Sequence, residues 1–183
     1  TNSARGYAGG FDARINGEFI KGLESWFTLS LLKTNEIITY LKNDSILTES
    51  KSLRRPTDRR VSASIMFQDE LRSNTDYRMH LMLNFGSGLP YYLTGEARYK
   101  SGNTIPAYKR VDIGFSKVII GGQNTKIKSR TIKKLWLGID VYNLLQINNV
   151  ISYIWVKDFS NNTYGVPNYL TGRRLNARLI MDF

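Results

Sequence analysis

The residue types that carry most enzyme chemistry are scarce in this chain. His80 is the only histidine and there is no cysteine, which excludes thiolate catalysis, a cysteine-ligated zinc site and disulfide bonds. In an alternating segment, the same-face neighbours of His80 are Arg78 and Met82, and neither can act as a nucleophile or a carboxylate partner. No serine lies in the glycine-flanked pattern of a nucleophile elbow. We therefore expect no enzyme activity, no catalytic residue, no metal site and no cofactor, and we interpret His80 as a hydrogen-bonded residue of a polar face.

Two pairs of opposite charges are spaced so that they can meet. Asp12 and Arg14, and likewise Arg110 and Asp112, are two residues apart, so in a strand the members of each pair share one face. Each residue can pair across that face or touch another segment. We expect structural ion pairs.

The net charge of +11 raises the question of nucleic acid. The basic residues are scattered along the chain in segments such as 51–55 and 126–130, whereas a nucleic-acid groove needs them to converge. We therefore exclude nucleic acid as a partner. Loops that face anionic lipid or lipopolysaccharide explain the charge better.

Aromatic residues outside the regular strands are the candidate ligand contacts. They gather after Pro90 and again between residues 146 and 174. Exposed aromatic rings stack on sugars or chelate rings, but tyrosine and tryptophan also form the interfacial belt of membrane proteins, and both interpretations stay open. The candidates for ligand binding are Tyr91, Tyr92, Tyr99, Tyr153, Trp155 and Tyr164.

Seven segments must position these residues, and in each of them apolar and polar side chains alternate. Such alternation predicts a strand with one apolar face, and the segments are 7–19, 23–31, 61–67, 77–85, 111–115, 135–141 and 175–183. The longest suit the roughly 9–11 residues with which a tilted strand crosses a bilayer. The polar faces mix Asp and Arg with Gly, which favours a water-filled lumen over the outside of a soluble sandwich. We assign Tyr7, Phe19, Tyr77 and Phe85 to the interfacial girdle.

The connections between the segments alternate between short and long, as they do in a membrane barrel. Links 17–22 and 69–76 are short, links 32–58, 86–107 and 146–174 are long, and link 119–131 is a mild exception. Tight periplasmic turns and large extracellular loops alternate in this way, and we interpret 150–157 as part of an extracellular hairpin. The fold class is thus all-β, a transmembrane antiparallel β-barrel. Seven strands cannot close such a barrel, so we expect further strands upstream, together with the signal peptide that an exported protein needs.

Four stretches resemble, in order and spacing, the TonB-dependent outer-membrane receptors. They read NFGSGLP at 84–90, YKRVDIGFS at 108–116, GIDVYNLL at 138–145 and YGVPNYLTGRRLNARLIMDF at 164–183. The resemblance covers nearly the whole chain from about residue 9. It is closest to receptors with a carboxypeptidase-regulatory-like N-terminal domain.

The resemblance implies that residues 1–183 are the C-terminal part of a 22-stranded barrel, about seven strands, with the plug domain and the remaining strands absent from this chain. It implies energy-coupled uptake of a siderophore, oligosaccharide or peptide across the bacterial outer membrane, with the C-terminus on the periplasmic side. The implied partners are outer-membrane lipid and lipopolysaccharide, the plug and the rest of the barrel, the TonB complex through the absent N-terminal part, the barrel-assembly machinery and a surface lipoprotein.

The last strand carries a second implication of the resemblance. A final aromatic residue preceded by apolar residues at every second position resembles the signal read by the barrel-assembly machinery, which would act by strand addition. A lipid-facing last strand with no recognition role is the alternative, and both can hold. The residues of this signal are Leu175, Ala177, Leu179, Met181 and Phe183.

Two other functions compete with transport. A receptor-like barrel can serve as a structural subunit of a larger outer-membrane complex. An outer-membrane lipase or protease would need a histidine with a serine or acidic partner near the extracellular rim, and the mid-strand position of His80 argues against it.

Overall fold

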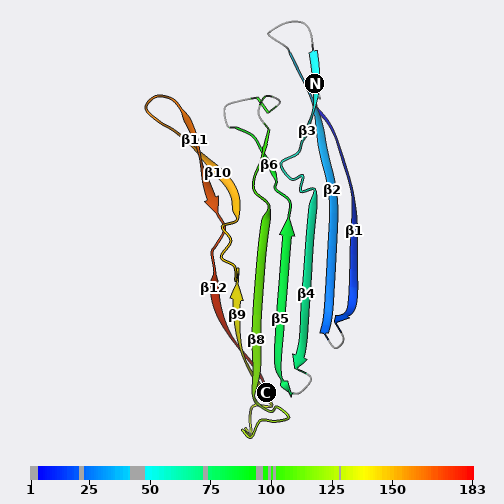
Figure 1. Ribbon diagram of the computed structural model, residues 1–183, viewed down its shortest axis with the longest axis vertical. Helices are drawn as coiled ribbons and strands as arrows, with labels where there is room; N and C mark the ends of the chain where they lie inside the picture. The colour runs from blue at the N-terminus through cyan, green and yellow to red at the C-terminus, as the bar shows by residue number, and fades with distance from the viewer. Residues whose placement is uncertain are drawn as a thin grey trace.

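The computed structural model describes residues 4–20, 23–41, 48–71, 74–93, 97–98, 100, 102–127 and 129–183. This part of the chain is all-β and contains no helix (Figure 1). No helix long and apolar enough to span a membrane is present among these residues. The strands are β1 (Ala4–Ile20), β2 (Leu23–Leu41), β3 (Thr48–Arg54), β4 (Val61–Leu71), β5 (Asn74–Gly86), β6 (Pro90–Tyr91), β7 (Asn103–Thr104), β8 (Tyr108–Ile120), β9 (Lys134–Tyr142), β10 (Val150–Lys157), β11 (Thr163–Tyr169) and β12 (Arg174–Asp182).

One antiparallel sheet contains all seven predicted segments. Its strands follow in the order β1-β2-β4-β5-β8-β9-β12, and β3 pairs with the far part of β2. The seven predicted strands are therefore confirmed. Strands β1 and β12 are the two edges, and the described residues do not close the sheet into a barrel.

The strand register places apolar residues beside apolar residues and polar residues beside polar residues on neighbouring strands. Every step from β1 to β8 is antiparallel and in register over the middle of the sheet. Successive side chains of a strand point to opposite faces of the sheet, so adjacent rows of paired residues lie on opposite faces. An apolar row contains Ile15, Phe27, Ile65, Leu83 and Val111, and the adjacent polar row contains Arg14, Thr28, Ser64, Asn84 and Arg110.

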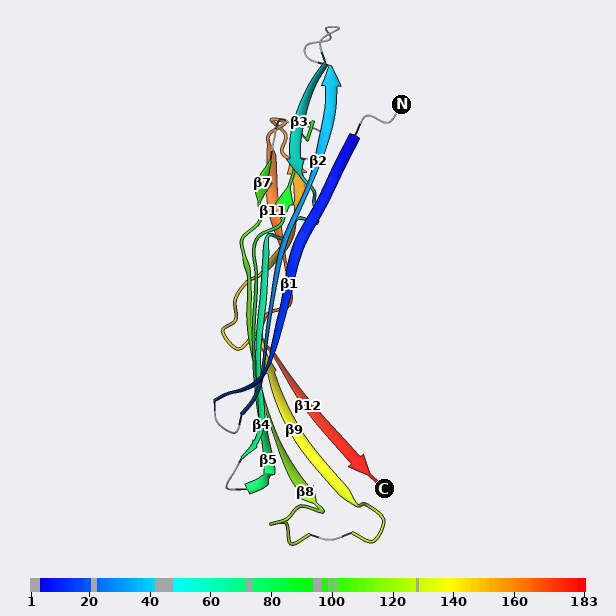
Figure 2. The same ribbon diagram turned by 90° about the vertical axis from the view of Figure 1, so that its right-hand side faces the viewer.

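The apolar face is uncovered. Phe11 is 61% exposed, Ile139 55% and Leu179 57%, because the sheet is a single layer over the described residues (Figure 2). The buried side chains of Val118 and Trp136 lie on the polar face, where the cationic groups of Arg78 and Lys134 lie over the Trp136 ring. The hydrophobic surface of this sheet therefore points away from the rest of the chain.

The long connections gather at one end of the sheet, which we call the hairpin end. The β2–β3 extension, the small β6–β7 pair and the β10–β11 hairpin all lie there, with the N-terminus, whereas the C-terminus lies at the opposite end (Figure 1). The expectation of a hairpin at 150–157 is confirmed, since β10 pairs with β11.

The long connection predicted at 32–58 contains strand structure that the alternation did not predict. Strand β2 continues to Leu41 and pairs with β3 from Asn35 onward. Beyond Leu31 one face of β2 carries both Lys33 and Ile37, so hydrophobic alternation no longer indicates the strand. The backbone pairing with β3 maintains the strand there.

Candidate functional site

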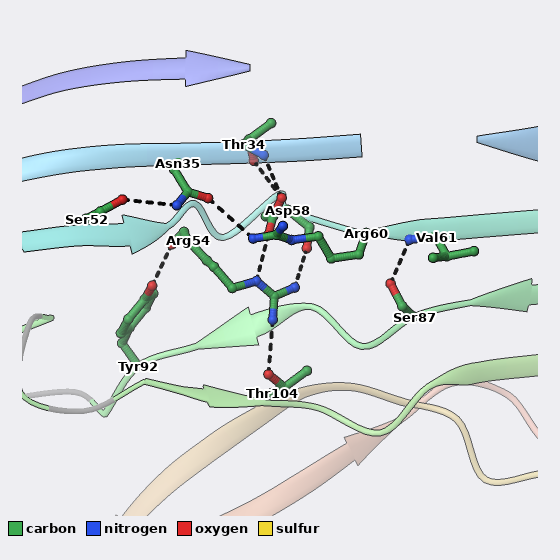
Figure 3. Close-up of polar contacts among 10 residues, drawn as sticks. All are labelled: Thr34, Asn35, Ser52, Arg54, Asp58, Arg60, Val61, Ser87, Tyr92 and Thr104. Carbon is green, nitrogen blue, oxygen red and sulfur yellow. Dashed lines mark hydrogen bonds and ion pairs between the residues drawn. The ribbon is translucent and has the colours of Figure 1, made fainter. Parts of the chain in front are cut away.

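A buried carboxylate organises the hairpin end. Asp58 lies between β3 and β4 with a side-chain exposure of 0%. Its carboxylate accepts hydrogen bonds from the Thr34 backbone N–H, Arg54 Nε and Arg60 Nε, each at 2.6 Å (Figure 3). Burial would raise the pKa of Asp58, but the Thr34 hydrogen bond and the two guanidinium groups hold that pKa below its usual value. Asp58 is therefore an ionised junction of β2, β3 and β4.

Arg54 links the Asp58 junction to the 86–107 connection. Its Nη2 donates to the Asp58 carbonyl at 2.8 Å, and its Nη1 donates to Thr104 Oγ1 on β7 at 3.3 Å. The Arg54 carbonyl in turn accepts a hydrogen bond from the Tyr92 hydroxyl at 2.5 Å (Figure 3). The β2–β3 extension and the 86–107 connection are thus held together by polar contacts.

A second carboxylate repeats the arrangement nearby. Glu36 of β2 is ion-paired with Arg98 and lies 3.9 Å from Arg55 Nε. The Arg98 guanidinium also lies 4.7 Å from the centre of the Tyr92 ring, a favourable cation–π geometry. Tyr92 is therefore fixed by its hydroxyl at one end and by Arg98 over its face.

Two cavities adjoin at this end. A basic pocket of about 280 Å³ lies between β3 and the 90–104 region, and an aromatic cavity of about 220 Å³ lies between that region and β10. Pro90 and Tyr92 line both. The charged residues of the basic pocket are Lys51, Arg54, Arg98 and Lys100.

Three predicted ligand contacts form the aromatic cluster of the second cavity. Tyr91 lies 4.9 Å from Tyr153 and 6.0 Å from Trp155, and the last two rings are 6.1 Å apart. Trp155 lies across Gly165 on β11, where an added Cβ would come within 2.8 Å of the indole ring. Because Gly165 has no side chain, the indole ring of Trp155 can pack directly on the backbone at this position.

The remaining predicted contacts lie elsewhere. Tyr164 pairs with Val156, so it lies on the opposite face of the β10–β11 hairpin from Trp155. Its hydroxyl donates to Asp158 at 3.1 Å. Hydrogen bonds from Asn162 and Tyr164 hold the pKa of Asp158 below its usual value. Tyr99 lies outside the described residues.

His80 does have a carboxylate neighbour, contrary to expectation. Its Nε2 lies 3.8 Å from Oδ1 of Asp140, which is on β9, two strands away. The register places Gly114 between them, and a Cβ at Gly114 would collide with both side chains. Considering neighbours only along one strand missed this contact. No hydrogen bond joins His80 to a hydroxyl in the described part of the chain.

The expected ion pairs are confirmed in one case. Arg110 Nε lies 2.7 Å from Asp112 Oδ1, and the same oxygen accepts the Asn143 backbone N–H at 2.8 Å. Arg14 instead donates to Asn16 Oδ1 at 3.0 Å, and no ion pair with Asp12 is found over the described ranges. These contacts stabilise the polar face and require no ligand.

The proposed assembly residues occupy the C-terminal edge strand. Strand β12 pairs only with β9 among the described strands. Its apolar side chains are exposed, with Leu175 at 76%, and Phe183, which directly follows the strand, is 69% exposed. Ala177, Leu179 and Met181 lie on the same face as Leu175.

Comparison with family models, with curated proteins and with solved structures finds no match to this chain.

Proposed function

We propose that this chain is the C-terminal part of an outer-membrane receptor that takes up a nutrient such as a siderophore, an oligosaccharide or a peptide by energy-coupled transport. The observation that carries the proposal is the uncovered apolar face of the long antiparallel sheet. Soluble monomers rarely expose a contiguous apolar patch above a few hundred Å². A face that runs apolar across all seven strands is suited to lipid.

Lipid on the apolar face has a consequence for the two edges. Strands β1 and β12 present unpaired backbone groups among the described residues, and such groups cost several kcal/mol each in hydrocarbon. Further strands between β12 and β1 would satisfy them. The 22-stranded barrel implied by the resemblance supplies such strands.

Two of the stretches that resemble the receptor family also contact each other. Asp112 of YKRVDIGFS accepts the backbone N–H of Asn143 in GIDVYNLL. Asn143 has a φ of 52°, a left-handed conformation that ends β9, and its Oδ1 accepts the Ile147 N–H at 3.1 Å. The turn that follows β9 therefore joins two of the stretches on which the resemblance is based.

Gene deletion tests the function. Cells without the full-length protein are grown on panels in which a ferric siderophore, an oligosaccharide or a peptide is the limiting nutrient. We expect loss of growth on one class, rescue by the wild-type gene and loss of uptake after addition of a protonophore. Trp155→Ala should rescue less well than Tyr164→Ala, which alters the other face of the same hairpin. Normal growth on every panel would contradict the proposal.

An alternative function as a structural subunit draws support from the β10–β11 hairpin. Its face opposite the aromatic cluster exposes Ile154, Val156, Tyr164 and Val166, and Phe159 at its tip is fully exposed. Such a surface suits a protein partner. A deletion that abolishes a surface complex and leaves all uptake intact would favour this alternative.

A further inference from the structure

We propose that the basic pocket binds the phosphate group of a phosphorylated sugar whose ring packs on the aromatic cluster. The assignment rests on the proposed function, whose ligand class it names. Pro90 and Tyr92 line both cavities, so the basic pocket and the aromatic cavity lie side by side.

The charge of the pocket is strongly unbalanced. Asp58 is contacted by Arg54 and Arg60, and Glu36 by Arg55 and Arg98. Lys100 lines the cavity as well. Among the described residues Asp58 and Glu36 are each contacted by two guanidinium groups, and this excess of positive charge over carboxylates attracts a multivalent anion. A phosphate monoester carries about −1.5 to −2 charges, whereas a carboxylate carries one.

The pocket also holds donors in fixed directions. Asp58 and Thr104 fix the Arg54 guanidinium, and Arg98 Nη2 is buried without a hydrogen-bond partner in the described part of the chain. Lys100 is exposed at the rim, and no side-chain partner for it is found among the described residues. Guanidinium groups match the geometry of phosphate oxygens, and Arg54 on β3, Arg98 and Lys100 line one pocket in which they can bind the same anion.

The aromatic cavity supplies the second half of the site. Tyr91, Tyr153 and Trp155 form one group of rings, and Ser152 adds a hydroxyl to the same lining. Flat aromatic faces with a few polar groups suit a sugar ring. A phosphate bonded to that ring would extend past Tyr92 into the basic pocket.

Calorimetric titration of the full-length protein in detergent tests the assignment. We expect glucose 6-phosphate to bind about a hundredfold more tightly than glucose, since hydrogen bonds to a charged group contribute about 1.5–3 kcal/mol each. Arg98→Gln and Lys100→Gln should each weaken glucose 6-phosphate about tenfold, and Trp155→Ala should weaken it as well. Lys157→Gln, which removes the same charge from the hairpin outside the pocket, should change nothing. Because Arg98 also holds Glu36, the Lys100 variant gives the decisive result.

Equal binding of glucose and glucose 6-phosphate, or an unchanged affinity in the Lys100 variant, would overturn the assignment. Titration with lipopolysaccharide vesicles before and after enzymatic dephosphorylation identifies the source of the phosphate. Phosphate-dependent binding of the vesicles alone would assign the site to a membrane glycolipid, and binding of the free sugar phosphate would assign it to a soluble ligand. Binding needs no energy source, so a failed uptake experiment with intact glucose 6-phosphate binding would reject transport and keep this site.

Discussion

Asp58→Asn removes the buried charge at the hairpin end with almost no change in shape. The substitution leaves Arg54 and Arg60 without their carboxylate and points an amide N–H₂ at one of them. Breaking a buried ion pair costs about 3–5 kcal/mol. Arg54 and Arg60 are 29% and 37% exposed, so water compensates part of the loss, and we expect a cost of about 2–4 kcal/mol.

The loss should appear as local opening of the β2–β3 extension. Amide hydrogen exchange reports such opening free energies, and about 2–4 kcal/mol corresponds to an acceleration of roughly 30- to 1,000-fold in β3. Asp158→Asn, which alters an exposed carboxylate at the hairpin tip, should leave β3 unchanged. An acceleration below about threefold in the Asp58 variant would refute the role of Asp58 as a junction.

The same carboxylate predicts a pH dependence. Because the folded pKa of Asp58 is lowered, its contribution is fully present above the unfolded pKa of about 3.9. The contribution is lost as pH falls through the lower folded pKa. Protection of β3 should therefore be constant from neutral pH to about pH 5 and fall in stronger acid, and Asp58→Asn should remove this dependence. The same acid dependence in wild type and variant would contradict the account.

Three further perturbations follow from individual contacts. Gly114→Val should destabilise the sheet by about 1–3 kcal/mol, because the new Cβ collides with His80 and Asp140. The measurement is the folded fraction on a heat-modifiability gel. Gly9→Val is the control, because the space around Gly9 is open. Asp76→Ala should expose the 121–133 connection to trypsin at Lys126, since Asp76 accepts the backbone N–H groups of Gln123 and Asn124 at 2.8 Å; cleavage at the wild-type rate would be the contrary result. Phe183→Ala should lower the amount of assembled protein in outer-membrane fractions, whereas Phe159→Ala, at a still more exposed phenylalanine, should not.

The main sheet was predictable because its evidence is local. Alternation over residues such as Phe11 to Ile15 reports a strand with two unlike faces, and that pattern needs no knowledge of the neighbours. The confirmed strands follow from it. The extension of β2 beyond Leu31 could not be predicted from alternation, because Lys33 and Ile37 lie on the same face and this face is therefore neither apolar nor polar.

The contacts of the hairpin end depend on residues distant in the chain. Nothing in the sequence around Asp58 indicates that Thr34 would donate to it, because the turn that brings them together depends on β3 pairing with β2. The contact between His80 and Asp140 likewise required the register of three strands. Aromatic composition identified Tyr91, Tyr153 and Trp155 as candidates. It did not identify the basic pocket beside them, whose cations come from two separate connections.

Site-directed spin labelling of the full-length protein in lipid vesicles tests the central claim most directly, and this chain has no native cysteine that would compete for the label. Labels at Leu29, Leu31 and Ile139 on the apolar face should collide often with oxygen and rarely with a water-soluble nickel complex. Labels at Thr28 and Ser30 on the polar face should show the reverse. Equal access of the nickel complex to both sets would place water on the apolar face and contradict the membrane account.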